Sequence, residues 1–191
     1  MIIYKDFIHK TEHKIFIDNN FNEPLTDADI EILSRYTHVQ FGKKFNQRVD
    51  NLPSSIKELF FGEDFDQPLE NLPASLVRLE FRGKFNQPID FLPESITHLH
   101  LGKHFNQPIN NLPKNLIVLQ LGTDFKQSID NLPDMIKYLT MPKYYHCSIK
   151  KFPMNLKFLY NPSNYSKELE ALIKSKKIKY TCMEDYEDMS D

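Results

Sequence analysis

One twenty-residue unit recurs along most of the sequence with small edits. Its clearest copy runs from residue 85 to residue 104 and begins Phe-Asn-Gln-Pro-Ile-Asp-Phe-Leu-Pro. The first aromatic residue returns at intervals of twenty, as Phe45, Phe65, Phe105, Phe125 and Tyr145. A constant period of this length, with an L-x-x-L-x-L segment inside each copy, is typical of a stacked β-solenoid. The chain is therefore expected to form one elongated unit in which each coil packs on its neighbours.

The second half of each copy predicts one short strand. In Ile56-x-x-Leu59-x-Phe61 and its equivalents, apolar residues end in an alternation of period two. This pattern predicts that residues 59 and 61 point inward and residues 58 and 60 outward. Equivalent strands of successive copies would pair in parallel, about 4.8 Å apart. A glycine follows most of these strands, and we interpret it as marking the turn out of the sheet.

Prolines determine the expected shape of the opposite side of each coil. Pro68, Pro88 and Pro108 hold the preceding glutamine extended, and the Leu-Pro step does the same to the leucine. Two prolines in each coil leave no room for a helix there. We therefore predict a mainly β, leucine-rich-repeat-like solenoid, right-handed, of about seven coils and about seven or eight strands. Its parallel sheet would line the concave side and extended chain the convex side.

The ends of the chain depart from the repeat and predict caps, because the apolar interior of a terminal coil has to be covered. Residues 1–14 are interpreted as an N-terminal cap and residues 15–161 as the solenoid. In the longer first copy, Thr26 precedes acidic residues and spaced apolar residues, which predicts a short helix reaching as far as Tyr36.

Beyond the solenoid, residues 162–183 are predicted to form a C-terminal cap of one helix and one strand. Leu169, Leu172 and Ile173 have helical spacing and would form the apolar side of that helix. Residues 184–191 include five acidic residues and are predicted to be a disordered tail.

Composition disfavours several classes of function. The 24 basic and 26 acidic residues give a net charge of −2, without the basic surplus that binding to nucleic acid requires. Two cysteines, Cys147 and Cys182, do not make a disulfide framework. No apolar run is long enough to span a membrane, and the first residues lack the apolar core of a signal peptide. We therefore expect a cytoplasmic protein with neither a nucleic-acid nor a membrane partner.

The combination of Phe-Asn-Gln-Pro-Ile, Asn-Leu-Pro and L-x-x-L-x-L-Gly resembles the FNIP repeat. Such repeats occur in proteins of social amoebae and of giant DNA viruses that infect amoebae, so a viral protein would act in the host cytoplasm. The resemblance covers residues 15–160 and implies a leucine-rich-repeat relative that serves binding. Many family members carry an F-box, which implies recruitment of substrates to a ubiquitin ligase. Fourteen residues before the repeats are too few for that three-helix domain, so none is expected in this sequence.

Equivalent positions in successive copies form columns, and comparing the copies separates columns with a structural role from columns that could bind a partner. The third residue of each regular copy is always Gln, and the residue before it is mostly Asn. Stacked side-chain amides can satisfy backbone groups from one coil to the next, so we interpret these columns as a structural ladder rather than as a repeating ligand groove. The ladder residues are Asn46, Gln47, Gln67, Asn86, Gln87, Asn106 and Gln107. We expect the ladder to weaken at Lys126 and His146.

A specific partner site should instead lie where the copies differ, on the outward positions of the strands. The predicted partner-binding residues are Glu58, Phe60, Arg78, Glu80, Arg82, His98, His100 and Gln120. Phe60 would be a solvent-facing aromatic residue beside charges of both signs, a composition typical of binding hot spots. The alternative interpretation is a solvated face with cross-strand ion pairs such as Glu58–Arg78.

A metal site formed by Glu80, His98 and His100 is geometrically possible. His38 would lie three strands away, about 14 Å, and could not complete it. We therefore expect no metal, no cofactor and no catalytic residue. The leading hypothesis is a monomeric, non-catalytic protein-interaction module. The alternatives are a structural protein of a virion or scaffold, and a substrate recruiter that works with a separate F-box protein.

Overall fold

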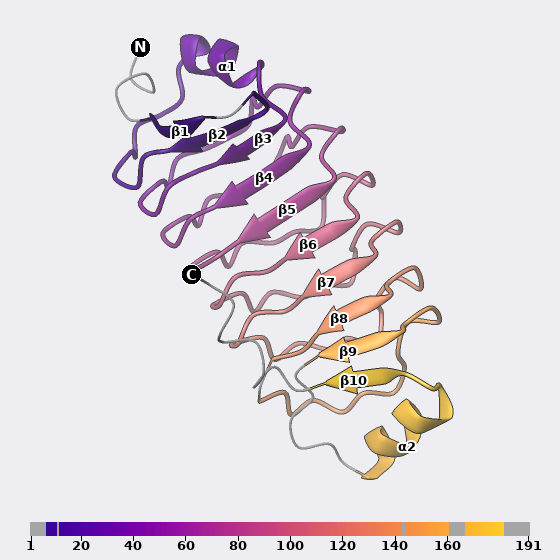
Figure 1. Cartoon of the computed structure of the whole chain (residues 1–191). Coiled ribbons are helices and arrows are strands. Elements are labelled where there is room, and N and C mark those ends of the chain that lie inside the picture. The colour runs from indigo at the N-terminus through magenta and orange to yellow at the C-terminus, as the bar shows by residue number, and fades with distance from the viewer. Residues whose placement is uncertain (1–6, 11, 143, 161–166, 182–191) are drawn as a thin grey trace.

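The computed structural model describes residues 7–10, 12–142, 144–160 and 167–181, which form one continuous sheet with two helices (Figure 1). The order of the strands in the sheet follows their order in the chain. The strands are β1 (Phe7–Lys10), β2 (Lys14–Ile17), β3 (His38–Gln40), β4 (Glu58–Phe61), β5 (Arg78–Phe81), β6 (His98–His100), β7 (Val118–Gln120), β8 (Tyr138–Thr140), β9 (Phe158–Tyr160) and β10 (Lys179–Thr181). The helices are α1 (Asp27–Leu33) and α2 (Lys167–Ser175).

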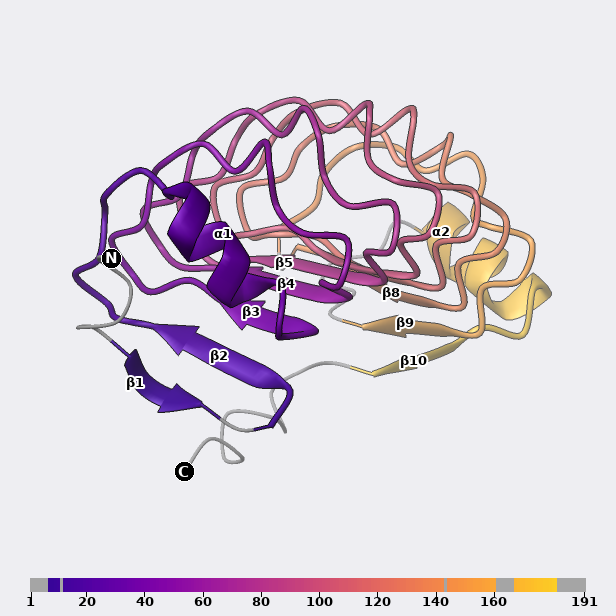
Figure 2. The ribbon, with the colours of Figure 1, turned by 90° about the horizontal axis from the view of Figure 1, so that it is seen from above.

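From β2 onward the strands pair in parallel, one strand from each coil, with equivalent residues in register. Figure 2 shows that the sheet arches, with the strands lining the concave side and the loops on the outer side. In the described residues between α1 and α2, the back of every coil is irregular extended chain. The predicted mainly β solenoid with a concave parallel sheet and a C-terminal helix is confirmed.

The described residues form a sheet of ten strands: β2 to β9 are the solenoid strands, eight as against the expected seven or eight, and β10 is the strand predicted after the C-terminal helix. The strand that was not expected, β1, pairs with β2 in antiparallel orientation, with Phe7 opposite Ile17. Only residues 11–13 separate these two strands, and a parallel connection would need a crossover of about a dozen residues or more. The N-terminal end of the solenoid is therefore closed by a hairpin rather than by another coil.

Aromatic rings stack along the interior of the solenoid. The starting residues of successive coils form one column with ring centroids 6.0 to 6.4 Å apart, comprising Phe45, Phe65, Phe85, Phe105, Phe125 and Tyr145. In the first half a second column, Phe41, Phe61 and Phe81, packs against the first at centroid distances of 4.0, 3.8 and 3.8 Å. The core is thus a continuous stack that no single coil could form.

The glycines that follow several of the strands have a different physical role from the one expected. No described glycine has a positive φ, so the turn itself does not require one. Instead, a Cβ atom at Gly62 would lie 2.2 Å from the carbonyl oxygen of Gly42, and one at Gly122 would lie 1.9 Å from that of Gly102. At these two positions glycine is needed because the backbones of neighbouring coils approach too closely for a side chain.

Both helices lie at ends of the solenoid. The predicted start of α1 is confirmed: Thr26 is the N-cap and forms a capping box with Asp29, and Asp29 Oδ2 accepts a hydrogen bond from the Thr26 backbone N at 2.8 Å. The helix ends at Leu33 instead of reaching Tyr36. In the C-terminal cap, Ile173 and Ile178 are buried against the last coil. The side chain of Leu169 and the predicted tail 184–191 lie outside the described residues.

Candidate functional site

Two rows of side chains cover the concave side of the sheet, and we call them together the concave face. They alternate along each strand with the buried residues of the core. The first row contains Lys14, His38, Glu58, Arg78, His98, Val118, Tyr138, Phe158 and Lys179. The second row contains Phe16, Gln40, Phe60, Glu80, His100, Gln120, Thr140 and Tyr160.

Phe60 is held between an imidazole and a guanidinium group. The ring of His38 stacks on it with centroids 4.5 Å apart, and the guanidinium carbon of Arg78 lies 5.4 Å from its centroid. His38 Nδ1 in turn lies 3.0 Å from Glu58 Oε2. Phe60 is half-buried as a result rather than fully exposed. The structure therefore brings together three of the predicted residues, Glu58, Phe60 and Arg78, and adds His38 to them.

The charges of the central strands form pairs that differ from the expected Glu58–Arg78 pair. Although these two residues are neighbours in register, the closest contact of Glu58 is with His38, and Arg78 Nη2 lies 3.4 Å from Glu80 Oε2. His100 Nδ1 lies 3.6 Å from the other oxygen of Glu80. Interaction with His100, supported by Arg78, holds the pKa of Glu80 below its usual value. Glu80 is therefore a carboxylate at neutral pH.

Two histidines of the first row are uncharged at neutral pH. Burial lowers the pKa of His38, and the nearby charges of Lys14 and Arg78 lower it further, against the opposite effect of Glu58. Burial and Arg78 also lower the pKa of His98, whose Nδ1 lies 2.8 Å from Thr97 Oγ1. The two imidazoles thus act as polar aromatic surface rather than as cations.

A hollow of about 220 Å³ lies at the ends of the central strands, next to Phe60. Its lining includes Gln40, Lys43, Phe60, Glu63 and Arg82. Lys43 Nζ is paired with Glu63 at 3.0 Å. Within the described part of the chain, no carboxylate lies at ion-pair distance from Arg82, although its charge contributes to the low pKa of Glu80. Arg82 occupies the place that a glycine has in the neighbouring coils, so this hollow is specific to these strands.

The remaining predicted residues lie farther along the sheet. Gln120 is beside His100 in register, and His98 is beside Arg78. Among the residues that the structure describes, there is no group of three or more side chains able to hold a metal ion, so Glu80, His98 and His100 do not converge as a metal site would require.

A second aromatic group on the concave face was missed by the sequence reasoning. Tyr138 and Phe158 stack with centroids 5.2 Å apart, and Tyr160 lies 6.4 Å from Phe158. The ammonium group of Lys179 lies 5.6 Å from the centroid of the Phe158 ring. Phe158 and Tyr160 belong to a copy in which the repeat has decayed. The alternation Phe-Leu-Tyr was nevertheless the same strand signal as in the regular copies.

The Asn and Gln columns form a continuous chain of hydrogen bonds along one corner of the solenoid. Oδ1 atoms of Asn46, Asp66, Asn86 and Asn106 accept from the backbone N of the equivalent residue in the next coil, at 2.8 to 2.9 Å. Nε2 atoms of Gln47, Gln67, Gln87, Gln107 and Gln127 donate to the backbone O or Oδ1 of the preceding coil. At Lys126 the acceptor is lost, and the Cys147 Sγ instead contacts the Lys126 backbone O at 2.9 Å.

Comparison with known proteins gives one family and one structural likeness. No helix in the described residues is long and apolar enough to cross a membrane, and no curated protein sequence matches significantly. The circular leucine-rich-repeat protein CroV588 of a giant virus is similar, with 25% sequence identity and a TM-score of 0.43. The likeness covers 84% of this chain and 39% of that one. The model of the FNIP repeat matches residues 34–64, 45–84, 85–111 and 108–144. The chain therefore belongs to the FNIP-repeat family.

Proposed function

We propose that the chain is a non-catalytic protein-interaction module that binds a protein partner on the concave face. The observation that carries the proposal is the placing of Phe60 between His38 and Arg78, beside the hollow that Arg82 lines. Aromatic residues and arginine are enriched in protein interfaces, where a few residues carry most of the binding energy.

Rigidity of the Phe60 cluster, which consists of His38, Glu58, Phe60 and Arg78, supports this role. Each of its side chains stands on a strand that is paired on both sides, and the rings and charges already contact one another without a partner. A preorganised surface loses little conformational entropy on binding, so more of the contact energy appears as affinity. Repeat scaffolds of this kind are generally used for interaction rather than for catalysis.

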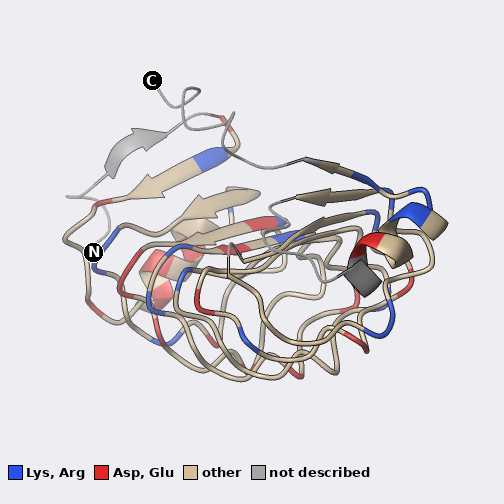
Figure 3. Cartoon of the chain, turned by 90° about the horizontal axis from the view of Figure 1, so that it is seen from below, with Lys and Arg blue, Asp and Glu red and all other residues tan. Residues whose placement is uncertain are grey.

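Charges of both signs are present on the central strands, and Figure 3 shows the same mixture over the loops of successive coils. Glu58 and Glu80 are already paired with His38, Arg78 and His100. A partner would therefore meet a polar surface whose carboxylates already contact neighbouring side chains, with Phe60 and Arg82 as the groups most available for new contacts. Such a surface favours specificity through shape and hydrogen bonding over long-range attraction.

A structural or assembly role is the second candidate, and one residue favours it. Phe91 is 87% exposed on the outer loops, in a column where the neighbouring coils have Asn. It borders an open hollow of about 790 Å³ that is also lined by Asp90, Asn111 and Leu112. An exposed aromatic residue next to a hollow can join copies of a chain.

Site-specific photo-crosslinking tests the proposal against this alternative. The photoreactive residue p-benzoylphenylalanine would replace Phe60 in one sample and Phe91 in another, and each protein would be irradiated with purified protein fractions from host cells. Crosslinking of a defined protein at position 60, lost when unlabelled wild-type chain competes and retained against unlabelled Phe60→Ala, would support the concave face. Crosslinks only at position 91, between copies of the chain, would support assembly and contradict the proposal.

A further inference from the structure

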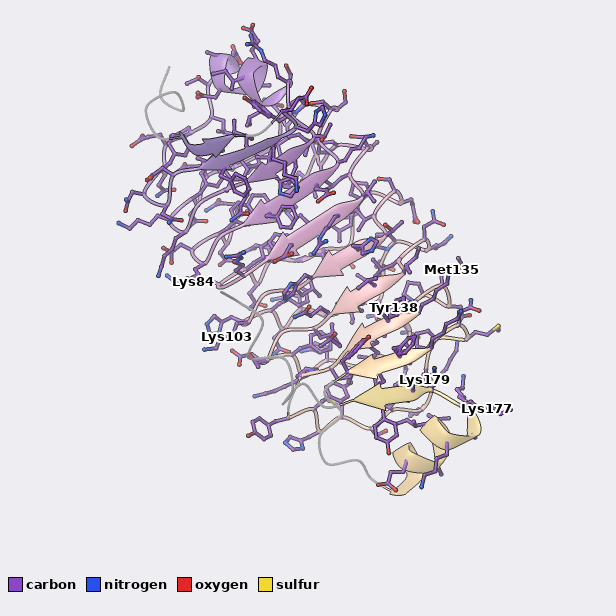
Figure 4. All side chains as sticks on the ribbon, viewed as in Figure 1. Lys84, Lys103, Met135, Tyr138, Lys177 and Lys179 are labelled. Atoms are coloured by element: carbon purple, nitrogen blue, oxygen red, sulfur yellow. The ribbon has the colours of Figure 1, made fainter. Side chains whose placement is uncertain are left out.

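We propose that the C-terminal half of the concave face is a docking site for an extended acidic segment of a partner protein. The site consists of Tyr138 on β8, Phe158 and Tyr160 on β9, and Lys179 on β10, which we call the aromatic–lysine cluster. Figure 4 looks onto the concave face and shows Tyr138 and Lys179 on it. The inference rests on the proposed function only in that both use this face, since no residue is shared with the Phe60 cluster.

Among the described residues, this half of the face carries a positive charge without a nearby carboxylate. None of the described side chains that β7 to β10 present to the concave side is acidic, whereas β4 and β5 present Glu58 and Glu80. Lys179 has its ammonium group over the Phe158 ring, 5.6 Å from the centroid. Within the described residues, no carboxylate lies at ion-pair distance from it. A partner carboxylate would complete a charge pair that the described residues leave open.

The arrangement of the rings selects among possible ligands. The Phe158 ring lies between the Tyr138 ring, parallel to it within 5°, and the Lys179 ammonium group. Both faces of Phe158 are therefore covered, so a nucleobase or a sugar ring could not stack on it. What Phe158 offers to solvent is its ring edge, the positive part of an aromatic quadrupole, and the cluster adds two phenolic hydroxyl groups and the ammonium group. These groups suit carboxylates.

The spacing of the cluster suits an extended segment that crosses the strands. The first-row residues Tyr138, Phe158 and Lys179 stand on three adjacent parallel strands. The backbone positions of Tyr138 and Lys179 are therefore about 10 Å apart. An extended peptide advances about 3.3 Å per residue, so about three residues span the cluster. Acidic residues at alternate positions would then reach the Lys179 ammonium group and a tyrosine hydroxyl together.

Fluorescence anisotropy with the full chain tests the inference. The probe is a fluorescein-labelled dodecapeptide of three Glu-Ser-Glu-Leu units, and its matched control has Gln in place of every Glu. We expect saturable binding of the acidic probe and a dissociation constant larger by about tenfold or more for the Gln peptide. We also expect the dissociation constant of the acidic probe to rise about tenfold in Lys179→Met, which keeps the apolar stem but removes the charge.

Lys177 provides the matched control, because it lies two residues away at the end of α2 and off the concave face (Figure 4). Lys177→Met should leave the dissociation constant within about twofold, because a charge off the concave face contributes only screened long-range attraction. Purely nonspecific attraction would instead fall equally in the two variants. Tyr138→Phe, which removes only a hydroxyl group, should weaken binding without affecting the stacking.

Three results would overturn the inference: equal binding of the Glu and Gln peptides, equal loss in the Lys177 and Lys179 variants, or binding that appears only after removal of residues 184–191. The last would mean that acidic residues of the chain itself take the site. Phe60→Ala should leave the peptide affinity unchanged. Crosslinking at position 60 without binding of the acidic probe would therefore reject this inference while leaving the proposed function intact.

Discussion

The Oδ1 atom of Asn86 accepts a hydrogen bond from the backbone N of Asn106, 2.8 Å away in the next coil. Asp66 makes the same contact to the backbone N of Asn86, at 2.9 Å. A side chain therefore satisfies, coil after coil, a backbone N–H group of the corner, which would cost free energy if it were left unpaired. The ladder couples neighbouring coils where the sheet does not reach.

Asn86→Leu is expected to lower the free energy of unfolding by about 1–3 kcal/mol, because it leaves the N–H group of Asn106 without an acceptor. Asn86→Asp should cost less, since the carboxylate of Asp66 already makes this bond. Urea denaturation of the two variants measures the difference. If both variants lost the same small amount, the contact would contribute nothing to stability.

The two glycines Gly102 and Gly122 should respond differently to the same substitution. A Cβ atom at Gly122 would lie 1.9 Å from the carbonyl oxygen of Gly102, whereas a Cβ atom at Gly102 would come no closer than 3.0 Å to any atom. Gly122→Ala should therefore destabilise by about 1–3 kcal/mol or more through overpacking, and Gly102→Ala by distinctly less. Thermal unfolding followed by circular dichroism compares them. Equal melting temperatures would show that the coils can separate slightly without cost.

Removal of one ring from the aromatic column should be among the most damaging single changes. Phe85 is 1% exposed and stacks between Phe65 and Phe105 at centroid distances of 6.0 Å. Phe85→Ala should cost about 3–5 kcal/mol, as for other large aromatic side chains removed from a packed core. The exposed Lys103 serves as the control, and Lys103→Ala should stay within about 0.5 kcal/mol. Similar midpoints for both variants in denaturant titrations would contradict the packing described here.

The positions of the strands and of their inward and outward residues repeat along the sequence and could be predicted from it. The contacts among side chains could not, because they depend on side-chain conformation. The alternation around Leu59 and its equivalents predicted which residues point into the core. It therefore also predicted that Phe60 and Glu80 lie on the concave face. The stacking of His38 on Phe60 depends on rotamers and on burial, which a periodic pattern does not encode. The close approach at Gly62 depends on the separation of coil backbones in the same way. Phe158 and Lys179 were missed because they follow the point where the Asn-Gln-Pro signal disappears.

Stability should fall with decreasing pH because His38 and His98 have lowered pKa values in the fold. For a histidine of this kind the unfolded chain binds protons more readily, so its contribution to stability is present above the unfolded pKa of about 6.5 and is lost as the pH falls below it. NMR titration of the ring signals should give midpoints below about 6.5 for both residues. A midpoint above this value for His38 would mean that Glu58, at 3.0 Å, outweighs burial.

Deletion of residues 162–191 should harm the protein more than deletion of residues 184–191. The longer deletion removes α2 and β10, and with them Ile173 and Ile178, which are buried against the last coil. It would expose the unpaired parallel edge of β9 and the apolar residues Phe152 and Leu156, which together form a template for aggregation.

The shorter deletion removes eight residues of which five are acidic. A segment of that composition buries little apolar surface, so its loss should leave the melting temperature nearly unchanged. Light scattering and thermal unfolding of the two truncated chains separate the effects, and we expect aggregation only after the longer deletion. If both chains were equally stable monomers, α2 would not be a cap. The helix would then be available as a docking element, and the partner would have to be sought there as well as on the concave face.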